Sequence, residues 1–213
     1  MASSLSSDIR QQIEKGIAIL KRGGVIAYPT DTVYGLGAGL KFTKAIERIY
    51  EIKERPRNMA LPLLLADYYQ LADLAKSISP LAMQLVHSYW PGALTLVLPA
   101  ISGVPDIVTA GGKTVAVRIP AYPVPIALAK GLKMPIVGTS ANLSGKPSPL
   151  TAEEVFAQLG DRVDFIIDGG RCPGGKESTI IDVSGARPVL VREGVIPRGE
   201  IERVGGIVLE EGN

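Results

Sequence analysis

The sequence predicts a mixed α/β fold, of the α/β or α+β class, in one domain. Segments whose apolar residues recur at helical spacing alternate with short, continuously apolar segments typical of buried strands. Of the 213 residues, 46% are hydrophobic and 21% are charged, which is the balance of a globular protein with a sizeable core. No repeat or linker-like segment divides residues 1–213, so we expect a single domain.

The first part of the chain predicts two helices with a strand between them. Apolar residues at helical spacing indicate a helix at 8–24, which Ser6 or Ser7 would cap and a pair of glycines would end. An apolar strand at 25–29 follows, and a second amphipathic helix is expected at 43–53.

The middle of the chain predicts three strands and two short helices. A buried strand is expected at 60–66. Short helices are expected to begin at Asp67 and at Ser79, where a proline takes the first helical position. Two further strands, 93–99 and 114–120, are separated by a glycine-rich turn.

The last part of the chain adds two helices and four strands. A helix is expected at 123–132, and another at 152–160 is introduced by a capping box of Thr151 and Glu154. An apolar strand at 134–142 ends in a polar loop. The three strands that close the sequence are expected at 163–170, 178–185 and 188–194.

Cys172 is the only cysteine and His87 the only histidine in the sequence. One chain therefore cannot build a disulfide framework, a Cys/His zinc site or a Cys/His nucleophile pair with members to spare. We expect a structural role for His87, and nothing in the sequence indicates that Cys172 is a nucleophile.

Charge and hydropathy favour a cytoplasmic protein. The net charge is only +2, which is too small to indicate a nucleic-acid partner, although local clusters of cations could still bind anions. The apolar runs are far shorter than the roughly 20 residues of a membrane helix. The segment from Met1 to Ser7 lacks the basic start and apolar stretch of a signal peptide, so we expect no membrane association.

Lys53, Arg55 and Arg57 stand two residues apart at the end of the second predicted helix. They fit a helix C-terminus, where cations interact favourably with the dipole and stay solvated. Pro56, however, favours an extended Arg55, and residues two apart in an extended segment point to the same side. If the helix ends before Lys53, the cations converge on one anion.

Two loops that follow apolar strands carry small polar side chains. Ser140 and Asn142, again two residues apart, offer a hydroxyl and an amide to a ligand, or they form an ordinary polar turn. Thr30, Thr32 and Tyr34 follow the first strand, where they could hold a small polar ligand or belong to a simple connection.

Two glycine-rich stretches differ from the nucleotide-binding motifs that they approach. Gly35, Gly37 and Gly39 are evenly spaced and precede a polar stretch, unlike a dinucleotide fingerprint. In GGRCPGGKEST, Glu177 takes the place of the Mg²⁺-binding Ser/Thr of a phosphate loop, and a strand follows where a helix is required. Ser178, at the start of that strand, could still contact a ligand.

Arg118 and Arg192 each lie in or near the end of an otherwise apolar strand. A buried guanidinium needs a partner or a cavity, and its planar donors suit a carboxylate. Both arginines are therefore candidate binding residues.

Taken in order, YPTDTVYGLGAG, IKERPRNMALPLL, WPGALTLVLP, VAVRIP, GTSANLSG, STIIDVSG and VREG resemble the motifs of the YrdC family of threonylcarbamoyl-adenylate synthases. The resemblance spans roughly residues 13–198. It implies a single twisted mixed sheet with flanking helices, folded around a large, positively lined cavity. It also implies a nucleotidyltransferase that makes threonylcarbamoyl-AMP and pyrophosphate from L-threonine, bicarbonate and ATP, for the threonylcarbamoyladenosine modification of tRNA.

The resemblance also assigns roles to particular residues. The implied catalytic and ATP-binding residues are Lys53, Arg55, Ser140 and Asn142. Arg192 is a further implied contact of ATP, and Tyr34 is an implied lining residue. The implied threonine-binding residues are Thr30, Thr32, Arg118 and Ser178. Mg²⁺ would accompany ATP and be held mainly through phosphates and water, so no residue is assigned as a metal ligand.

Two features depart from the family pattern. Some members have a histidine soon after the Lys-x-Arg segment, whereas MALPLLLA has none. Longer members carry an additional C-terminal domain, and we expect this chain to be the short form. A downstream tRNA threonylcarbamoyl transferase is the implied functional partner.

Two alternatives to the enzyme remain at this point. The first is an RNA-binding module that uses the basic cavity, and weak RNA binding is also expected beside an enzymatic activity. The second is a carbamoyl-adenylate-handling domain of the kind found in hydrogenase-maturation proteins.

Overall fold

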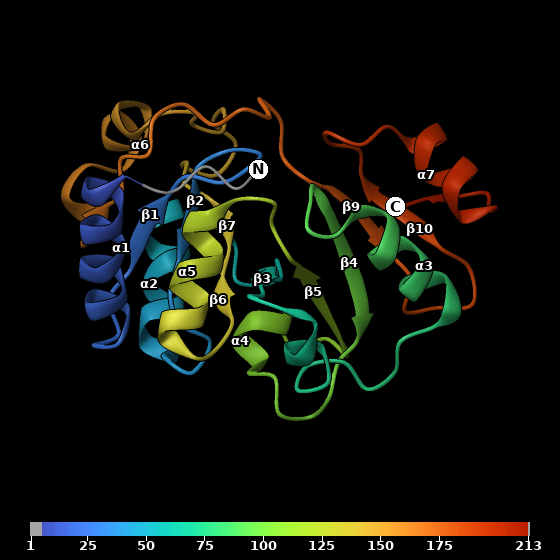
Figure 1. The fold of residues 1–213 in the computed structure, drawn as a ribbon. Coiled ribbons are helices and arrows are strands. Elements are labelled where there is room, and N and C mark those ends of the chain that lie inside the picture. The colour runs from blue at the N-terminus through green and yellow to red at the C-terminus, as the bar shows by residue number, and fades with distance from the viewer. Residues whose placement is uncertain (1–5, 213) are drawn as a thin grey trace.

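Residues 6–212 are described by the computed structural model, in which two mixed β-sheets are surrounded by helices (Figure 1). The smaller sheet has the order β7-β2-β1-β8 and contains β1 (Ile26–Tyr28), β2 (Gly35–Gly37), β7 (Thr139–Ser140) and β8 (Phe165–Ile166). The larger sheet has the order β11-β10-β9-β4-β5-β3-β6 and contains β3 (Leu63–Leu64), β4 (Leu94–Pro99), β5 (Thr114–Arg118), β6 (Ile136–Val137), β9 (Thr179–Asp182), β10 (Val189–Arg192) and β11 (Glu210–Glu211). Each sheet combines parallel and antiparallel pairs, which confirms the predicted mixed α/β fold.

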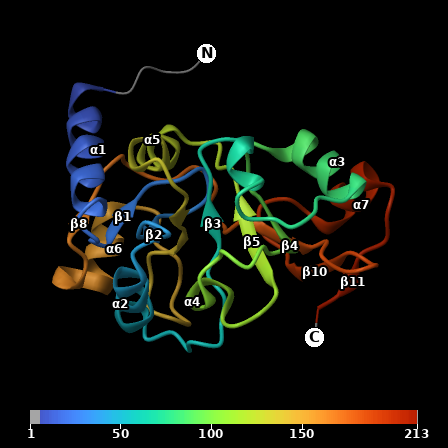
Figure 2. The same cartoon turned by 90° about the horizontal axis from the view of Figure 1, so that it is seen from below.

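The helices lie mainly at the two ends of the molecule. They are α1 (Ser7–Leu20), α2 (Thr43–Lys53), α3 (Pro80–Tyr89), α4 (Asp106–Thr109), α5 (Pro123–Leu132), α6 (Ala152–Leu159) and α7 (Arg198–Gly205), with the 3-10 helices η1 (Tyr68–Leu71) and η2 (Gly160–Arg162). In both views α1 and α2 lie at the end that carries the smaller sheet, whereas α3 and α7 lie at the end that carries β10 (Figures 1 and 2).

Local signals account for most of these helix boundaries. The ranges of α2 and α5 are those predicted from the sequence. Ser6, Ser79 and Thr151 accept backbone N–H groups at the starts of α1, α3 and α6, as expected of N-caps. The sequence patterns described above do not predict α4, α7, β2 or β11. The first and last of these have four and two residues, too few to show a periodicity.

The expectation of one single sheet is wrong. The segment 134–142, predicted as one strand, is divided at Gly138 into β6, which pairs with β3, and β7, which pairs with β2. A Cβ at residue 138 would lie 2.4 Å from a side-chain carbon of Leu64, so only glycine lets the chain pass this close to β3. The chain therefore crosses from the larger sheet to the smaller one at Gly138.

Two clusters of buried apolar residues hold the sheets and helices together. The larger cluster includes Leu36 of the smaller sheet together with Leu63 and Leu96 of the larger one. The smaller cluster packs α1 and α5 against β1 through residues such as Leu20 and Leu128. Because the larger cluster joins both sheets, their relative position is set by shared apolar burial.

Within residues 6–212, no helix has the length and apolar character needed to cross a membrane. The prediction about a signal peptide rests mostly on Met1 to Leu5, which lie outside the described residues. The prediction of a single domain over residues 1–213 stays a prediction.

Candidate functional site

A cavity of about 470 Å³ lies between the two sheets and is lined by residues from both of them. The predicted site residues that line it are Thr30, Thr32, Tyr34, Arg55, Arg118, Ser140, Ser178 and Arg192. Lys53 and Asn142 are buried just outside it. Segments far apart in the sequence therefore meet here, because the loop after β1, both residues of β7, the C-terminal ends of β5 and β10, and the residues just before β9 all line the same space.

The threonines after β1 form a tight local turn. The Thr30 hydroxyl donates to the carbonyl oxygen of Val33 at 2.6 Å and lies 3.0 Å from the Thr32 hydroxyl. The Thr32 backbone N–H donates back to Thr30 Oγ1 at 3.0 Å. Both side chains are buried, so the turn presents fixed hydroxyl groups to the cavity instead of flexible ones.

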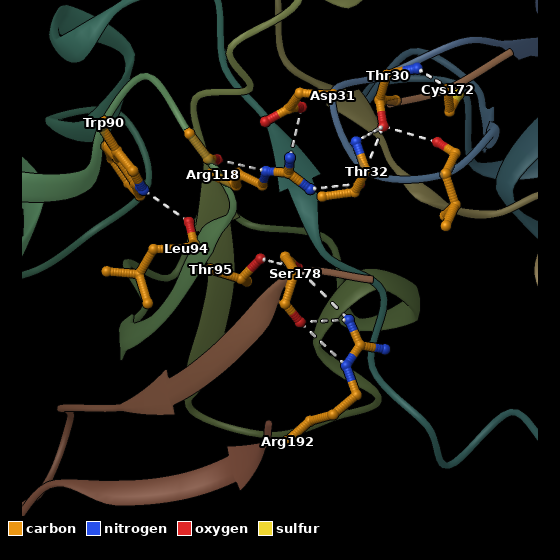
Figure 3. A network of polar contacts seen from close by, with 12 residues as sticks. Thr30, Asp31, Thr32, Trp90, Leu94, Thr95, Arg118, Cys172, Ser178 and Arg192 are labelled. Carbon is orange, nitrogen blue, oxygen red and sulfur yellow. Dashed lines mark hydrogen bonds and ion pairs between the residues drawn. The ribbon is translucent and has the colours of Figure 1, made fainter. Parts of the chain in front are cut away.

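Arg118 is buried at the end of β5 and makes three hydrogen bonds (Figure 3). Its Nε donates to the Gly92 carbonyl oxygen at 2.8 Å, Nη1 to Thr32 Oγ1 at 3.1 Å, and Nη2 to Asp31 Oδ1 at 2.5 Å. A guanidinium has five N–H donors, so two of them remain for a ligand. Asp31 compensates the buried charge and orients the fork toward the cavity.

Arg192 and Ser178 form a second polar group on the opposite wall (Figure 3). Arg192 donates from Nη2 to the Ser178 carbonyl oxygen at 2.9 Å and from Nε to the same atom at 3.2 Å. The Ser178 hydroxyl lies 2.8 Å from the hydroxyl of Thr95 on β4. Within residues 6–212, Arg192 Nη1 has no hydrogen-bond partner, so this end of the guanidinium is open to an anion.

The sequence-based geometry for Lys53 and Arg55 is wrong in one respect. α2 continues through Lys53, and Glu54 adopts the left-handed conformation with φ 51° and ψ 40°, so the two cations do not share one extended segment. The Arg55 N–H returns to the Tyr50 carbonyl oxygen at 2.9 Å. This helix end has the geometry of a left-handed C-cap, and it directs Arg55 to the cavity and Lys53 into the protein.

Arg55 is incompletely bonded for a guanidinium in this position. Nη2 donates to the Ala60 carbonyl oxygen at 3.0 Å. Nε is buried and has no hydrogen-bond partner among the described residues. Burial lowers the pKa of Arg55, and a buried unpaired donor is costly. An anion in the cavity would relieve both costs. Arg57 is exposed, and among residues 6–212 its one ion-pair contact is with Glu51, at 3.8 Å, as expected of a solvated cation.

Lys53 joins the end of α2 to the loop after β7. Its ammonium donates to the carbonyl oxygens of Ser140 and Asn142, the latter at 2.7 Å, and to Asn142 Oδ1 at 3.0 Å. The Asn142 amide in turn donates to the Lys146 carbonyl oxygen at 2.5 Å. Burial and the nearby Arg55 lower the pKa of Lys53 to about 7. The four residues of the Lys-x-Arg and Ser-x-Asn pairs thus lie together, although Lys53 and Asn142 support the wall without lining it.

Three residues near the cavity were not assigned by sequence reasoning. Asp31 lies between two predicted threonines and binds Arg118. Thr95 is a polar residue in the otherwise apolar strand β4. A polar residue in an apolar strand is also the signal that identified Arg118. Glu177 precedes Ser178 and lines the cavity. Its carboxylate accepts a hydrogen bond from the Ser148 hydroxyl.

His87 and Tyr34 differ in their position relative to the cavity. His87 is exposed in the last turn of α3 and does not line the cavity. Tyr34 lines the cavity, and its hydroxyl donates to the Gly170 carbonyl oxygen and accepts the Gly169 backbone N–H. In the described part of the chain, no three His, Cys, Asp or Glu side chains are grouped so that they could hold a metal ion.

We expect Cys172 to resist alkylation in the native protein. The thiol is buried, it accepts the Thr30 backbone N–H at 3.4 Å, and burial raises its pKa to about 11, so very little thiolate exists at neutral pH. Iodoacetamide labelling followed by mass spectrometry should give no adduct in buffer and a complete adduct in denaturant. Rapid labelling of the folded protein would contradict the buried position.

Comparison with known proteins gives one consistent result. A family model named Sua5_yciO_yrdC, with the description "Telomere recombination", matches residues 18–194. A threonylcarbamoyl-AMP synthase of Bacillus subtilis is 46% identical over 199 residues, covering 92% of this chain and 57% of that protein. A threonylcarbamoyl-AMP synthase of Pyrococcus abyssi is 43% identical over 204 residues, covering 93% of this chain and 60% of that protein.

A solved structure agrees with these relatives. Pyrococcus abyssi Sua5 in complex with L-threonine superposes with a TM-score of 0.91 at 42% identity, over 94% of this chain and 58% of that chain. The chain thus spans somewhat more than half the length of the relatives named here.

Proposed function

The chain belongs to the Sua5/YciO/YrdC family, and from this membership we propose that it synthesises threonylcarbamoyl-AMP. The substrates are L-threonine, bicarbonate and ATP, and the second product is pyrophosphate. The observation that carries the proposal is the convergence of Arg55, Arg118 and Arg192, from three separate segments, on one cavity. Arg55 Nε supports it further, because a buried donor without a partner needs an acceptor from a ligand.

The proposed reaction needs such a cavity. A carbamate formed on the threonine amine attacks the α-phosphorus of ATP, and the bond to the pyrophosphate leaving group breaks. A carboxylate, a carbamate and a polyphosphate must therefore share one space, where they repel one another unless cations are fixed around them. Transfer at phosphorus depends largely on positioning and charge stabilisation, which suits a site built from arginines and hydroxyl groups.

In this proposal the two walls hold different substrates. Arg118, with two unused donors, binds the threonine carboxylate, and Asp31 keeps its fork oriented. Thr30, Thr32 and Ser178 contact threonine through their hydroxyl groups. Arg55, Arg192 and Ser140 bind ATP phosphates.

Lys53 and Asn142 serve ATP binding in this proposal by holding the loop after β7, since their polar groups are engaged with one another. Mg²⁺ accompanies ATP and lowers the negative charge of its phosphates.

The proposal is tested with the purified chain. ATP, bicarbonate, Mg²⁺ and L-threonine are expected to give pyrophosphate and, by mass spectrometry, threonylcarbamoyl-AMP, whereas reactions without threonine or bicarbonate give neither. A folded protein that releases no threonine-dependent pyrophosphate would contradict the proposal. Supply of the product to a tRNA threonylcarbamoyl transferase, and weak RNA binding, stay predictions. Salt-sensitive RNA binding that ATP does not displace would favour the RNA-binding alternative.

A further inference from the structure

Glu177 is an acidic residue in a cavity whose other charged lining residues are arginines. It is the one Asp or Glu among the described residues that line the cavity, together with Arg55, Arg118 and Arg192. Under the proposed function, this space receives the polyphosphate of ATP. A fixed carboxylate repels phosphate oxygens, so its presence calls for a physical reason.

A glutamate carboxylate is ordinarily ionised at neutral pH, and that of Glu177 is not neutralised by an ion pair. Within residues 6–212, no nitrogen of a lysine or arginine side chain comes within the 4.0 Å of an ion pair with Glu177. The negative charge is therefore available to a cation inside the cavity.

The two carboxylate oxygens have different surroundings. Oε1 accepts the Ser148 hydroxyl, which fixes the orientation of the group. Oε2 accepts no hydrogen bond from another residue in the part of the chain that the structure describes. One oxygen is thus held by the protein, and the other is left for a ligand.

We propose that Glu177 is the protein ligand of the Mg²⁺ ion that enters with ATP. The inference rests on the proposed function, because the remaining ligands are phosphate oxygens and water. Mg²⁺ prefers hard oxygen ligands and is commonly bound by one or two carboxylates plus substrate phosphates. The described residues offer no group of three acidic or His/Cys side chains for a metal, so binding of the ion depends on the nucleotide.

This assignment predicts effects of opposite sign with and without the metal. Without Mg²⁺, the Glu177 charge repels the phosphates, so Glu177→Gln should bind a non-hydrolysable ATP analogue as tightly as the wild type or up to several-fold more tightly. With saturating Mg²⁺, the same variant loses a metal ligand. We expect the gain in affinity that Mg²⁺ gives to the wild type to fall by about tenfold or more.

Isothermal titration calorimetry with the analogue in EDTA and in Mg²⁺ measures both effects. The matched control is Glu193→Gln, which removes the same charge from an exposed residue outside the cavity lining and should change neither value. Glu177→Asp, which keeps the charge on a shorter side chain, should retain part of the Mg²⁺ effect. Replacing Mg²⁺ with Mn²⁺ should give an electron paramagnetic resonance spectrum in the ternary complex that differs between the wild type and Glu177→Gln.

The outcomes separate the inference from the proposed function. If Glu177→Gln weakens analogue binding by the same factor in EDTA and in Mg²⁺, Glu177 only ties the loop at Ser148 to β9, and the inference is overturned while the function stands. If the wild type binds no analogue under either condition, both are overturned. If Glu177→Gln is poorly folded by circular dichroism, Glu177→Asp and the Mn²⁺ spectrum decide, and an unchanged spectrum overturns the inference.

Discussion

Under the proposed function, replacing Arg55 with alanine is expected to lower ATP-dependent formation of threonylcarbamoyl-AMP by about 10²- to 10³-fold, the size of effect typical for a preorganised donor at a developing charge. The fold should remain intact, because the guanidinium makes only one hydrogen bond within the described residues, to the Ala60 carbonyl oxygen. The buried Nε of Arg55 has no partner there, so the substitution also removes an unfavourable buried donor. Product formation and thermal unfolding are measured on the same preparation.

Arg57→Ala is the matched control for this experiment. Arg57 lies two residues further along and is exposed. Its 3.8 Å contact with Glu51 is a kind of pair that contributes little. Its loss should leave turnover within about twofold of the wild type, the change in barrier expected for less than about 0.5 kcal/mol. Wild-type turnover in Arg55→Ala, or an equal loss in Arg57→Ala, would show that the position of Arg55 in the cavity has no special role.

Replacing Lys53 with methionine is expected to lower the free energy of unfolding by about 3 kcal/mol. Methionine fills a similar volume but leaves three acceptors, the carbonyl oxygens of Ser140 and Asn142 and Asn142 Oδ1, without their donor. Each buried unsatisfied group costs about 1–3 kcal/mol, and partial access of water to the loop reduces the sum. Urea denaturation followed by circular dichroism gives the value.

The matched control for Lys53→Met is Lys44→Met, at an exposed position of the same helix. This change should alter the free energy of unfolding by no more than about 0.5 kcal/mol. If both variants were equally stable, the contacts of Lys53 with the loop would not contribute to stability. The inference that Lys53 holds the loop after β7 would then be wrong.

The wild type should also gain stability relative to Lys53→Met as the pH rises above about 7. The pKa of Lys53 is lowered to about 7 in the folded protein, chiefly by burial, whereas an unfolded chain keeps the lysine protonated up to a pKa of about 10.4. Between these values the unfolded state binds more protons, so the free energy of unfolding increases with pH. Urea denaturation of both proteins across this range checks the sign, and a difference that shrinks as the pH rises would contradict it.

Sequence reasoning succeeded where the relevant contacts are local. α2 begins at Thr43 and ends at Lys53, as the apolar spacing and Pro56 predict, and Thr151 caps α6 through residues within one turn. Polar residues in apolar strands were also informative. Arg118 was identified because a buried guanidinium requires a partner, and the structure supplies Asp31.

Sequence reasoning failed where a residue's partners come from distant segments. The predicted strand 134–142 divides because Gly138 must pass close to Leu64 of another strand. Glu177 was noted only as a mismatch to a phosphate loop, since its place in the cavity depends on how β9 packs against the rest of the larger sheet.

The ranges of α2 and α5, the mixed α/β class, the family resemblance and most of the polar side chains that line the cavity could be predicted from the sequence. The tertiary structure decided how those side chains divide their roles. Lys53 and Arg55 are two residues apart, yet a left-handed Glu54 sends one to a loop 89 residues away and the other to the cavity. Such outcomes depend on burial and hydrogen bonding between segments that the chain brings together only on folding, whereas helix boundaries depend on neighbours within a few residues.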